Sequence, residues 1–220
     1  MRRFQPLAIA LTLVVTCAAG FVIIESIATA GPSDPQPTKA APRQAPEGKP
    51  KSQAQVFIVG DSLTVGARPW LARELRRRDS QLVGVTARIS WHVDEGLEVL
   101  RRMGDSLPAT VMVALGTNDL QASTSQVERW LRTARELVGD RRLIWVNLRC
   151  NASHSKLLAR YRVINDALDV AAPRYGVEIA DWDAWAGARR VRTLSDGVHY
   201  SPAAYRLRAS FYAKVATAEP

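Results

Sequence analysis

The sequence is poor in cysteine and histidine, with two cysteines and three histidines among its 220 residues. If a leader containing Cys17 is removed, only Cys150 remains, and the mature chain has no internal disulfide. Its stability then has to come from a hydrophobic core, and Cys150 is interpreted as a buried thiol at a strand end. The histidines lack the spacing of metal ligands and no cysteine cluster exists, so the sequence indicates no metal and no cofactor.

Acidic residues are also scarce relative to basic ones, 21 against 30, and the formal net charge is +9. A nucleic-acid partner is one interpretation of such an excess. The arginine clusters at residues 76–78, 101–102 and 141–142, however, are expected at helix ends or before strands, where they form solvated surface. We therefore expect no nucleic-acid partner, and attraction to an anionic cell surface is the interpretation that suits an exported protein.

Charge is absent from residues 6–24, an apolar run that follows Arg2 and Arg3 and precedes a small-x-small sequence at residues 28–30. This pattern is typical of an export signal, but the run is also long enough to span a bilayer. We expect residues 1–30 to be a signal peptide or an N-terminal membrane anchor. The chain is then exported, and is either secreted or tethered through residues 6–24 to the outer face of a bacterial cytoplasmic membrane. Lipidation at Cys17 is a third alternative, which the preceding Thr16 disfavours.

Apolar periodicity is missing from residues 31–54, which are rich in proline, alanine, glutamine and lysine. Such a segment cannot bury enough surface to order itself, so we expect an extended, disordered linker. Residues 55–220 form the predicted folded domain, for which a monomer is the favoured oligomeric state.

Five short apolar runs in this domain alternate with segments of helical spacing. The runs are Val56–Val59, Leu82–Thr86, Thr110–Leu115, Leu143–Leu148 and Val177–Ala180. A final helix is predicted from Ser201 and Pro202 toward Lys214. The alternation predicts an α/β fold with three α/β/α layers and a flavodoxin-like, five-stranded parallel sheet of order 2-1-3-4-5. No internal repeat supports a solenoid, and no internal linker supports two smaller domains.

In this strand order a ligand site is expected where the carboxyl ends of the first and third strands meet. Residues 60–63, Gly-Asp-Ser-Leu, leave the first strand, and residues 116–119, Gly-Thr-Asn-Asp, leave the third. The sequence therefore predicts that Ser62 and Asn118 approach each other at this edge of the sheet.

A serine hydroxyl becomes a nucleophile when an adjacent base takes its proton and a carboxylate orients that base. His199 is the candidate base, because Asp196 precedes it by three residues in a turn directly before the last helix. A plain Asp-Gly turn is the alternative interpretation of this segment. His92 and His154 are expected to be surface or capping residues.

An acyl-transfer site also needs hydrogen-bond donors where negative charge develops on the carbonyl oxygen. The backbone N–H at Ser62 and the side-chain amide of Asn118 are the candidate donors. The alternative for Asn118 is a turn residue or a helix cap.

The order Gly-Asp-Ser-Leu, Gly-Thr-Asn-Asp and Asp-x-x-His resembles the SGNH hydrolases, also called the GDSL family of esterases and acyltransferases, over about residues 55–217. The resemblance implies that Ser62 is the nucleophile, His199 the base and Asp196 its partner, with Ser62 and Asn118 as oxyanion donors. The family usually has a glycine after the second strand whose amide completes the oxyanion hole. Ala87 occupies that position here, so its N–H is the implied third donor and the shape of its loop is in question.

Within the family, residues 85–97 (VTARISWHVDEGL) and the later blocks look most like extracellular domains that add or remove acetyl groups on cell-wall polysaccharides. The resemblance implies a serine esterase acting on small acyl esters or acylated polysaccharides. An O-acetyltransferase working with a membrane partner and a catalytically idle carbohydrate-binding module are the alternatives. A nucleotide-binding flavodoxin-like protein is disfavoured, because Asp61 would place a carboxylate where phosphate binds.

Arg88 and Trp91 follow the second strand and are candidates for substrate binding at the mouth of the site, with Trp91 as a stacking face for a sugar ring. Packing on the adjacent helix is the alternative for Trp91. Trp182 and Trp185 are ambiguous in the same way, and packing is the favoured interpretation for both.

Overall fold

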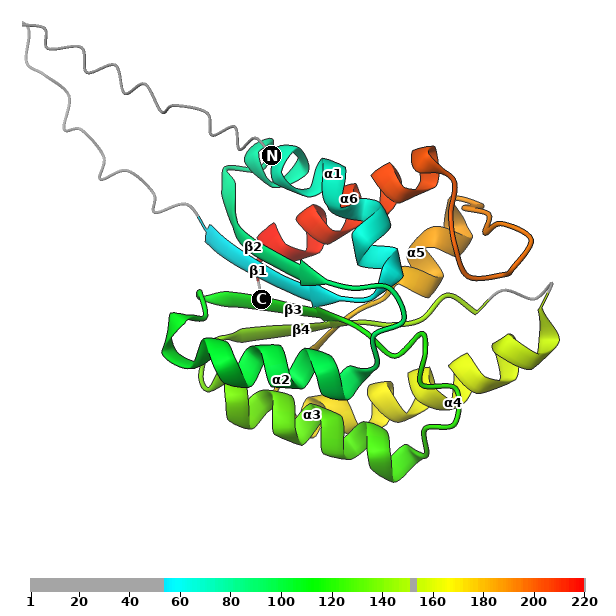
Figure 1. Ribbon diagram of the computed structural model, residues 1–220, viewed down its shortest axis with the longest axis horizontal. Coiled ribbons are helices and arrows are strands. Elements are labelled where there is room, and N and C mark those ends of the chain that lie inside the picture. Colours follow the sequence, from blue (N-terminus) through cyan, green and yellow to red (C-terminus); the bar gives the residue numbers. More distant parts are fainter. Residues whose placement is uncertain (1–53, 151–153, 220) are drawn as a thin grey trace, which may run out of the picture. The chain divides into compact units, whose positions relative to one another are not determined.

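The computed structural model describes residues 54–150 and 154–219, which form a sheet with helices on both faces (Figure 1). The expected leader at residues 1–30 and all of the expected linker except Ala54 lie outside the described residues. Within the described part of the chain, no helix is both long and apolar enough to cross a membrane.

The sheet has five parallel strands in the order β2-β1-β3-β4-β5, which confirms the predicted order and fold class. Every predicted strand is present, with ends that differ by a residue or two. The strands are β1 Ala54–Gly60, β2 Ser80–Ala87, β3 Thr110–Ala114, β4 Arg142–Val146 and β5 Glu178–Ala180.

Three helices cover each face of the sheet (Figure 1). One face carries α2 Val93–Met103, α3 Thr124–Val138 and α4 Ser155–Ala171, and the other carries α1 Ser62–Arg76, α5 Trp182–Ala188 and α6 Pro202–Thr217. Two short 3₁₀ helices, η1 Gly104–Ser106 and η2 Ala172–Tyr175, follow α2 and α4. Successive side chains of a strand point to opposite faces, so Phe57 and Val59 pack toward α2–α4 while Val56 and Ile58 pack toward α1 and α6. This burial on both faces explains why the central strands are continuously apolar.

The last helix begins as predicted, with Ser201 as its N-cap and Pro202 in its first turn. The Ser201 hydroxyl accepts a hydrogen bond from the Ala204 N–H at 3.3 Å. The Asp-x-x-His turn directly precedes this cap. It therefore lies next to the start of α6.

The packing interpretation is confirmed for Trp182, which is fully buried and donates a hydrogen bond to the Tyr200 hydroxyl at 2.9 Å. Its ring stacks on Trp185 at 5.4 Å between centroids, and both rings contact Phe211 of α6. These tryptophans therefore join α5 to α6 in the core.

Candidate active site

Ser62 is the first residue of α1 and directly follows the turn that leaves β1. Asp61 is the N-cap: its Oδ1 accepts the Leu63 N–H at 2.9 Å, and its carbonyl accepts the N–H groups of Thr64 and Val65 at 3.1 and 3.0 Å. Gly60 leaves room for this turn, since a Cβ there would lie 2.1 Å from the Thr64 hydroxyl. Asp61 thus shapes the helix start, and the serine hydroxyl projects from the turn.

The hydroxyl of Ser62 lies 3.0 Å from Nε2 of His199, which is 137 residues away in sequence. The Nδ1 atom of the same ring lies 2.7 Å from Oδ2 of Asp196. Both distances are those of well-formed hydrogen bonds. The three residues named from the sequence therefore form a continuous serine–histidine–aspartate chain.

The hydrogen-bonding partners fix the tautomer of His199. The ionised carboxylate of Asp196 can only accept, so Nδ1 of the ring carries the proton and donates it. The lone pair of Nε2 then accepts the hydrogen bond from the Ser62 hydroxyl. The ring is therefore oriented to remove the serine proton.

The carboxylate of Asp196 is held in place by its own turn. Its Oδ1 accepts the N–H groups of Val198 and His199, each at 2.9 Å. Partial burial raises the pKa of Asp196, but the hydrogen bonds from the Val198 amide, the His199 ring and the His199 amide outweigh it and lower the pKa to about 2. The carboxylate is consequently ionised throughout the neutral range.

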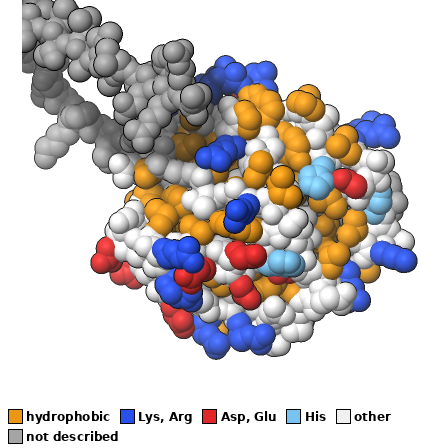
Figure 2. All heavy atoms as spheres, in the orientation of Figure 1, with side chains coloured by type: hydrophobic (Ala, Val, Ile, Leu, Met, Phe, Trp, Pro, Cys, Tyr) orange, Lys and Arg blue, Asp and Glu red, His pale blue; other side chains and the backbone are white. Residues whose placement is uncertain are grey.

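The side chains of the triad are open to solvent: His199 is 41% exposed and Asp196 is 48% exposed. The large apolar side chain of Leu194, whose N–H donates to the His199 carbonyl, is exposed as well. Figure 2 shows histidine side chains at the surface of this face, with hydrophobic side chains around them. The reacting groups therefore lie on an accessible surface instead of at the bottom of a deep pocket.

The two predicted oxyanion donors, Ser62 and Asn118, follow neighbouring strands of the sheet. The N–H groups of residues 63–65 already bond to Asp61, so in the described part of the chain the first-turn amide left for an incoming oxygen is that of Ser62. Asn118 follows β3, whose last residue pairs with Gly60 at the end of β1. Its Nδ2 donates one hydrogen to the Trp91 carbonyl at 2.7 Å, and its second hydrogen can bind another acceptor.

Ala87 ends β2, and its amide is less suited to be the third donor. The N–H of Arg88 points toward β1, because it donates to the Gly60 carbonyl at 3.2 Å. Successive N–H groups of a strand alternate in direction, so the N–H of Ala87 points to the open edge of the sheet. The role of the Ala87 amide as a third oxyanion donor stays a prediction, and the direction of its N–H does not favour that role. The residue of this loop with a left-handed backbone is Ser90, with φ 63°, and not Ala87.

Arg88 is exposed at the end of β2, and the partly buried Trp91 packs against the hydrophobic core. Trp91 also accepts the hydrogen bond from Asn118 through its carbonyl, so the structure gives it a supporting role at the site. Binding of substrate by these two residues stays a prediction.

The remaining histidines both lie at helix starts. His92 is the N-cap of α2, and its Nδ1 lies 3.2 Å from Oδ1 of Asp119. His154 is the N-cap of α4. Its Nε2 donates to the Ser195 carbonyl at 2.9 Å, and its ring packs against the turn that contains Gly197.

The sequence did not single out His154 as part of the site, because the contact joins segments 41 residues apart. Gly197 has φ 77°, and a Cβ there would lie only 2.5–2.8 Å from the His154 ring. This ring therefore supports the turn that carries Asp196 and His199. The Asp-Gly pair at residues 196–197 indicated a turn in the sequence, but nothing in the sequence indicated that the His154 ring contacts this turn.

The environment of Cys150 does not suit a nucleophile. Cys150 is partly buried, and its N–H donates to Asp183. Burial first, and then the Asp183 carboxylate, raise the pKa of the thiol to about 12. Cys150 is thus a protonated thiol at neutral pH. Among the residues described, no group of three or more histidine, cysteine or acidic side chains is arranged to hold a metal ion.

A small cavity of about 10 Å³ lies between the triad turn and the carboxyl ends of the strands. Its walls include Leu63, Thr117 and Val198, which are neighbours of Ser62, Asn118 and His199 in sequence. Leu148 and Tyr161 close its other side. A space of this size holds about one water molecule or methyl group.

The sequence matches the model of the GDSL-like lipase/acylhydrolase family over residues 58–207, which includes all three triad residues. No curated protein sequence is significantly similar to this chain.

Several solved structures share the fold. A lipase/acylhydrolase from Enterococcus faecalis has a TM-score of 0.62 at 14% identity, covering 75% of this chain and 96% of that one. The catalytic domain of Streptococcus pneumoniae peptidoglycan O-acetyltransferase A has a TM-score of 0.60 at 20% identity, covering 76% of this chain and 92% of that one. A family 3 carbohydrate esterase from Clostridium thermocellum has a TM-score of 0.60 at 16% identity, covering 74% of this chain and 94% of that one. At these identities the comparisons show a common fold.

Replacing Asp196 by asparagine should change the acid dependence of stability. Because the folded pKa of about 2 lies below that of an unfolded aspartate, ~3.9, the carboxylate stabilises the fold above about pH 4, and this contribution is lost as the pH falls toward 2. Urea unfolding of the wild type and of Asp196→Asn between about pH 5 and pH 2 should show a difference that shrinks on acidification. Asp105→Asn, which removes an exposed carboxylate on η1, is the control. A stability difference between the two proteins that does not depend on pH would contradict the lowered pKa of Asp196.

Replacing Gly197 by alanine should disturb the triad turn, because the new Cβ meets the His154 ring and the left-handed backbone disfavours alanine by about 1–2 kcal/mol. We expect an organophosphonate probe to label Ser62 about tenfold more slowly in this variant. Gly176→Ala is the matched control: its φ is 59°, but its Cβ would meet only Arg135 at 3.8 Å. Equal labelling rates in the two variants would show that His154 does not support the turn.

Proposed function

Because this chain belongs to the GDSL-like lipase/acylhydrolase family, we propose that it is a serine esterase that hydrolyses acetyl esters. The observation that carries the proposal is the chain of hydrogen bonds from Ser62 through His199 to Asp196, with lengths of 3.0 and 2.7 Å. This geometry is ready for proton transfer without rearrangement of the three side chains.

The proposed reaction begins with attack of the Ser62 oxygen on the ester carbonyl, while its proton moves to Nε2 of His199. The imidazolium that forms is stabilised by the carboxylate of Asp196. The oxyanion of the tetrahedral intermediate accepts hydrogen bonds from the Ser62 amide and the Asn118 side chain.

Collapse of this intermediate breaks the bond to the leaving alcohol, which takes the proton from His199. The acyl group is then bonded to Ser62. Water, deprotonated by the same histidine, attacks the acyl-serine and releases the carboxylic acid, and the serine recovers its proton. The same residues thus act in both halves of the reaction.

The small cavity beside the triad supports acetyl as the acyl group. The cavity has room for a group about the size of one water molecule, whereas a longer acyl chain would have to displace Leu148, Val198 or the phenol of Tyr161. The exposure of His199 and Asp196 supports a bulky alcohol, such as an acetylated polysaccharide, because the leaving group is then outside the protein.

The proposal extends to location and partners. The apolar run at residues 6–24 supports export and a tether to a membrane, and we propose that the enzyme acts outside the cytoplasm as a monomer. The acyl-serine would also be the intermediate of an O-acetyltransferase, in which a sugar hydroxyl replaces water as the acceptor.

The nucleophile is tested with p-nitrophenyl acetate and the full chain. Ser62→Ala should lower kcat by about 10⁴-fold or more, because no other group can form the acyl intermediate. Ser106→Ala, which changes an exposed serine on η1, should retain full activity. Equal rates in the Ser62→Ala variant and the wild type would refute the assignment.

The acyl preference is tested with p-nitrophenyl esters of increasing length. We expect kcat/KM to fall by about tenfold or more from acetate to butanoate, since each methylene that does not fit costs about 1–3 kcal/mol. Val198→Ala enlarges the cavity and should recover part of the loss for butanoate. Leu207→Ala, which shortens an exposed side chain on α6, should not. A preference of the wild type for octanoate would contradict the proposed acetyl specificity.

A further inference from the structure

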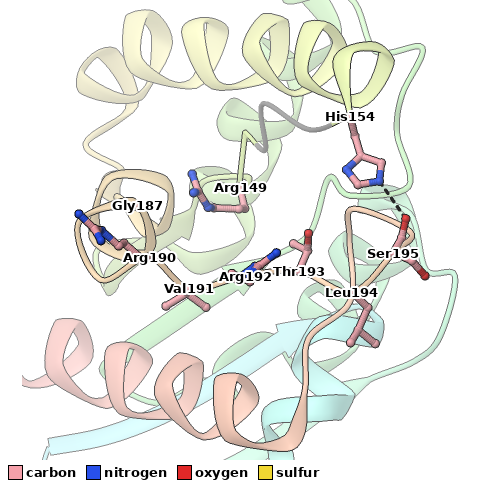
Figure 3. A pocket seen from close by; sticks show the side chains of 9 residues that line it. All are labelled: Arg149, His154, Gly187, Arg190, Val191, Arg192, Thr193, Leu194 and Ser195. Atoms are coloured by element: carbon pink, nitrogen blue, oxygen red, sulfur yellow. Dashed lines mark hydrogen bonds between the residues drawn. The ribbon is translucent and has the colours of Figure 1, made fainter.

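A larger cavity, of about 490 Å³, lies on the other side of the turn that carries Asp196. Its walls come from the segment that follows β4, the start of α4, the end of α5 and the segment that leads to α6 (Figure 3). Ser195, the residue before Asp196, forms one wall, and His154 forms another. A cavity of this volume can hold one or two sugar rings.

Three arginines line this cavity: Arg149, Arg190 and Arg192. Arg149 is already paired with Asp183 through its Nη1 atom, at 2.5 Å. Arg190 and Arg192 are exposed, and within residues 54–150 and 154–219 neither forms an ion pair with a carboxylate. The cavity therefore carries a net positive charge that the described residues do not neutralise.

The cavity adjoins the triad turn through two of its lining residues. Ser195 is adjacent in sequence to Asp196, and its carbonyl is held by His154. Arg149 lines both this cavity and the small acyl cavity, where Leu63 and Val198 flank the triad. A polymer whose ester reaches Ser62 would thus place a neighbouring unit against the arginines.

We propose that this cavity binds a carboxylate-bearing sugar of an acidic polysaccharide, next to the acetylated sugar whose ester reaches Ser62. The inference rests on the proposed esterase function and names its substrate class. Guanidinium groups match the planar carboxylate and bind it through paired hydrogen bonds, whereas a neutral sugar would leave their charge uncompensated. Part of the +9 net charge of the chain then serves substrate binding.

The substrate class is tested by the release of acetate from acetylated polygalacturonate, which is acidic, and from acetylated xylan, which is neutral. The wild type should have the higher kcat/KM for the acidic polymer, and the difference should shrink when salt rises from about 50 to about 500 mM. In the double variant Arg190→Gln with Arg192→Gln, the ratio of the two kcat/KM values should fall about tenfold, mainly through KM. Arg132→Gln, on the exposed surface of α3, should leave the ratio unchanged.

No preference of the wild type for the acidic polymer, or an equal fall in the Arg132→Gln control, would overturn the inference. Calorimetric binding of oligogalacturonate to the Ser62→Ala full chain tests the cavity without turnover, and this binding should weaken about tenfold when both arginines are replaced. Absence of binding to the Ser62→Ala chain also overturns the inference. Inorganic phosphate competing as strongly as galacturonate would overturn the assignment to a carboxylate.

Failure of the proposed esterase function can be distinguished from failure of the anionic binding site. If the full chain hydrolyses neither p-nitrophenyl acetate nor either polymer, the esterase assignment fails. Arginine-dependent binding of oligogalacturonate would then still support the anionic site.

Discussion

A buried carboxylate lies beneath the turn that presents Ser62, and the active-site geometry depends on it. Asp61 is fully buried, and burial raises its pKa, although the charge of Arg208 and the Leu63 N–H oppose the effect. Burying a carboxylate without such compensation would be costly. Arg208 lies on α6, is itself 2% exposed, and donates to the Tyr212 hydroxyl at 2.8 Å. The last helix therefore brings a buried positive charge to the surroundings of the turn after the first strand.

The rest of the site is assembled by short connections at the same edge of the sheet. The parallel order brings the ends of β1 and β3 together, so Ser62 and Asn118 follow neighbouring strands. The turn before α6 adds His199, and the start of α4 supports that turn through His154. Each side chain of the proposed site is thus fixed by a helix start or a tight turn, where unpaired backbone N–H groups are available.

The fold and the triad could be predicted from the sequence because their signals are local. Continuous apolar strands, the cap at Ser201 and the Asp-x-x-His spacing are properties of neighbouring residues, and strand order then brings them together. The contact of His154 with Ser195, the compensation of Asp61 by Arg208 and the two cavities could not be predicted. They join segments that are far apart in sequence, and they depend on side-chain orientations. The position of Ala87 illustrates the same limit: the block after β2 was recognised, but the direction of a single N–H depends on strand register.

The separation of Ser62 and His199 by 137 residues has a consequence for the timing of activity. The nucleophile is close to the start of the folded domain, and its base directly precedes the last helix. A nascent or unfolded chain has a serine but no positioned base, and ordinary serine hydroxyls are poor nucleophiles. On the proposed mechanism, the chain therefore acquires reactivity only when α6 has docked. On the proposal that the chain is an exported esterase, a chain that crosses the membrane unfolded is unreactive and does not attack acetyl esters inside the cell that makes it.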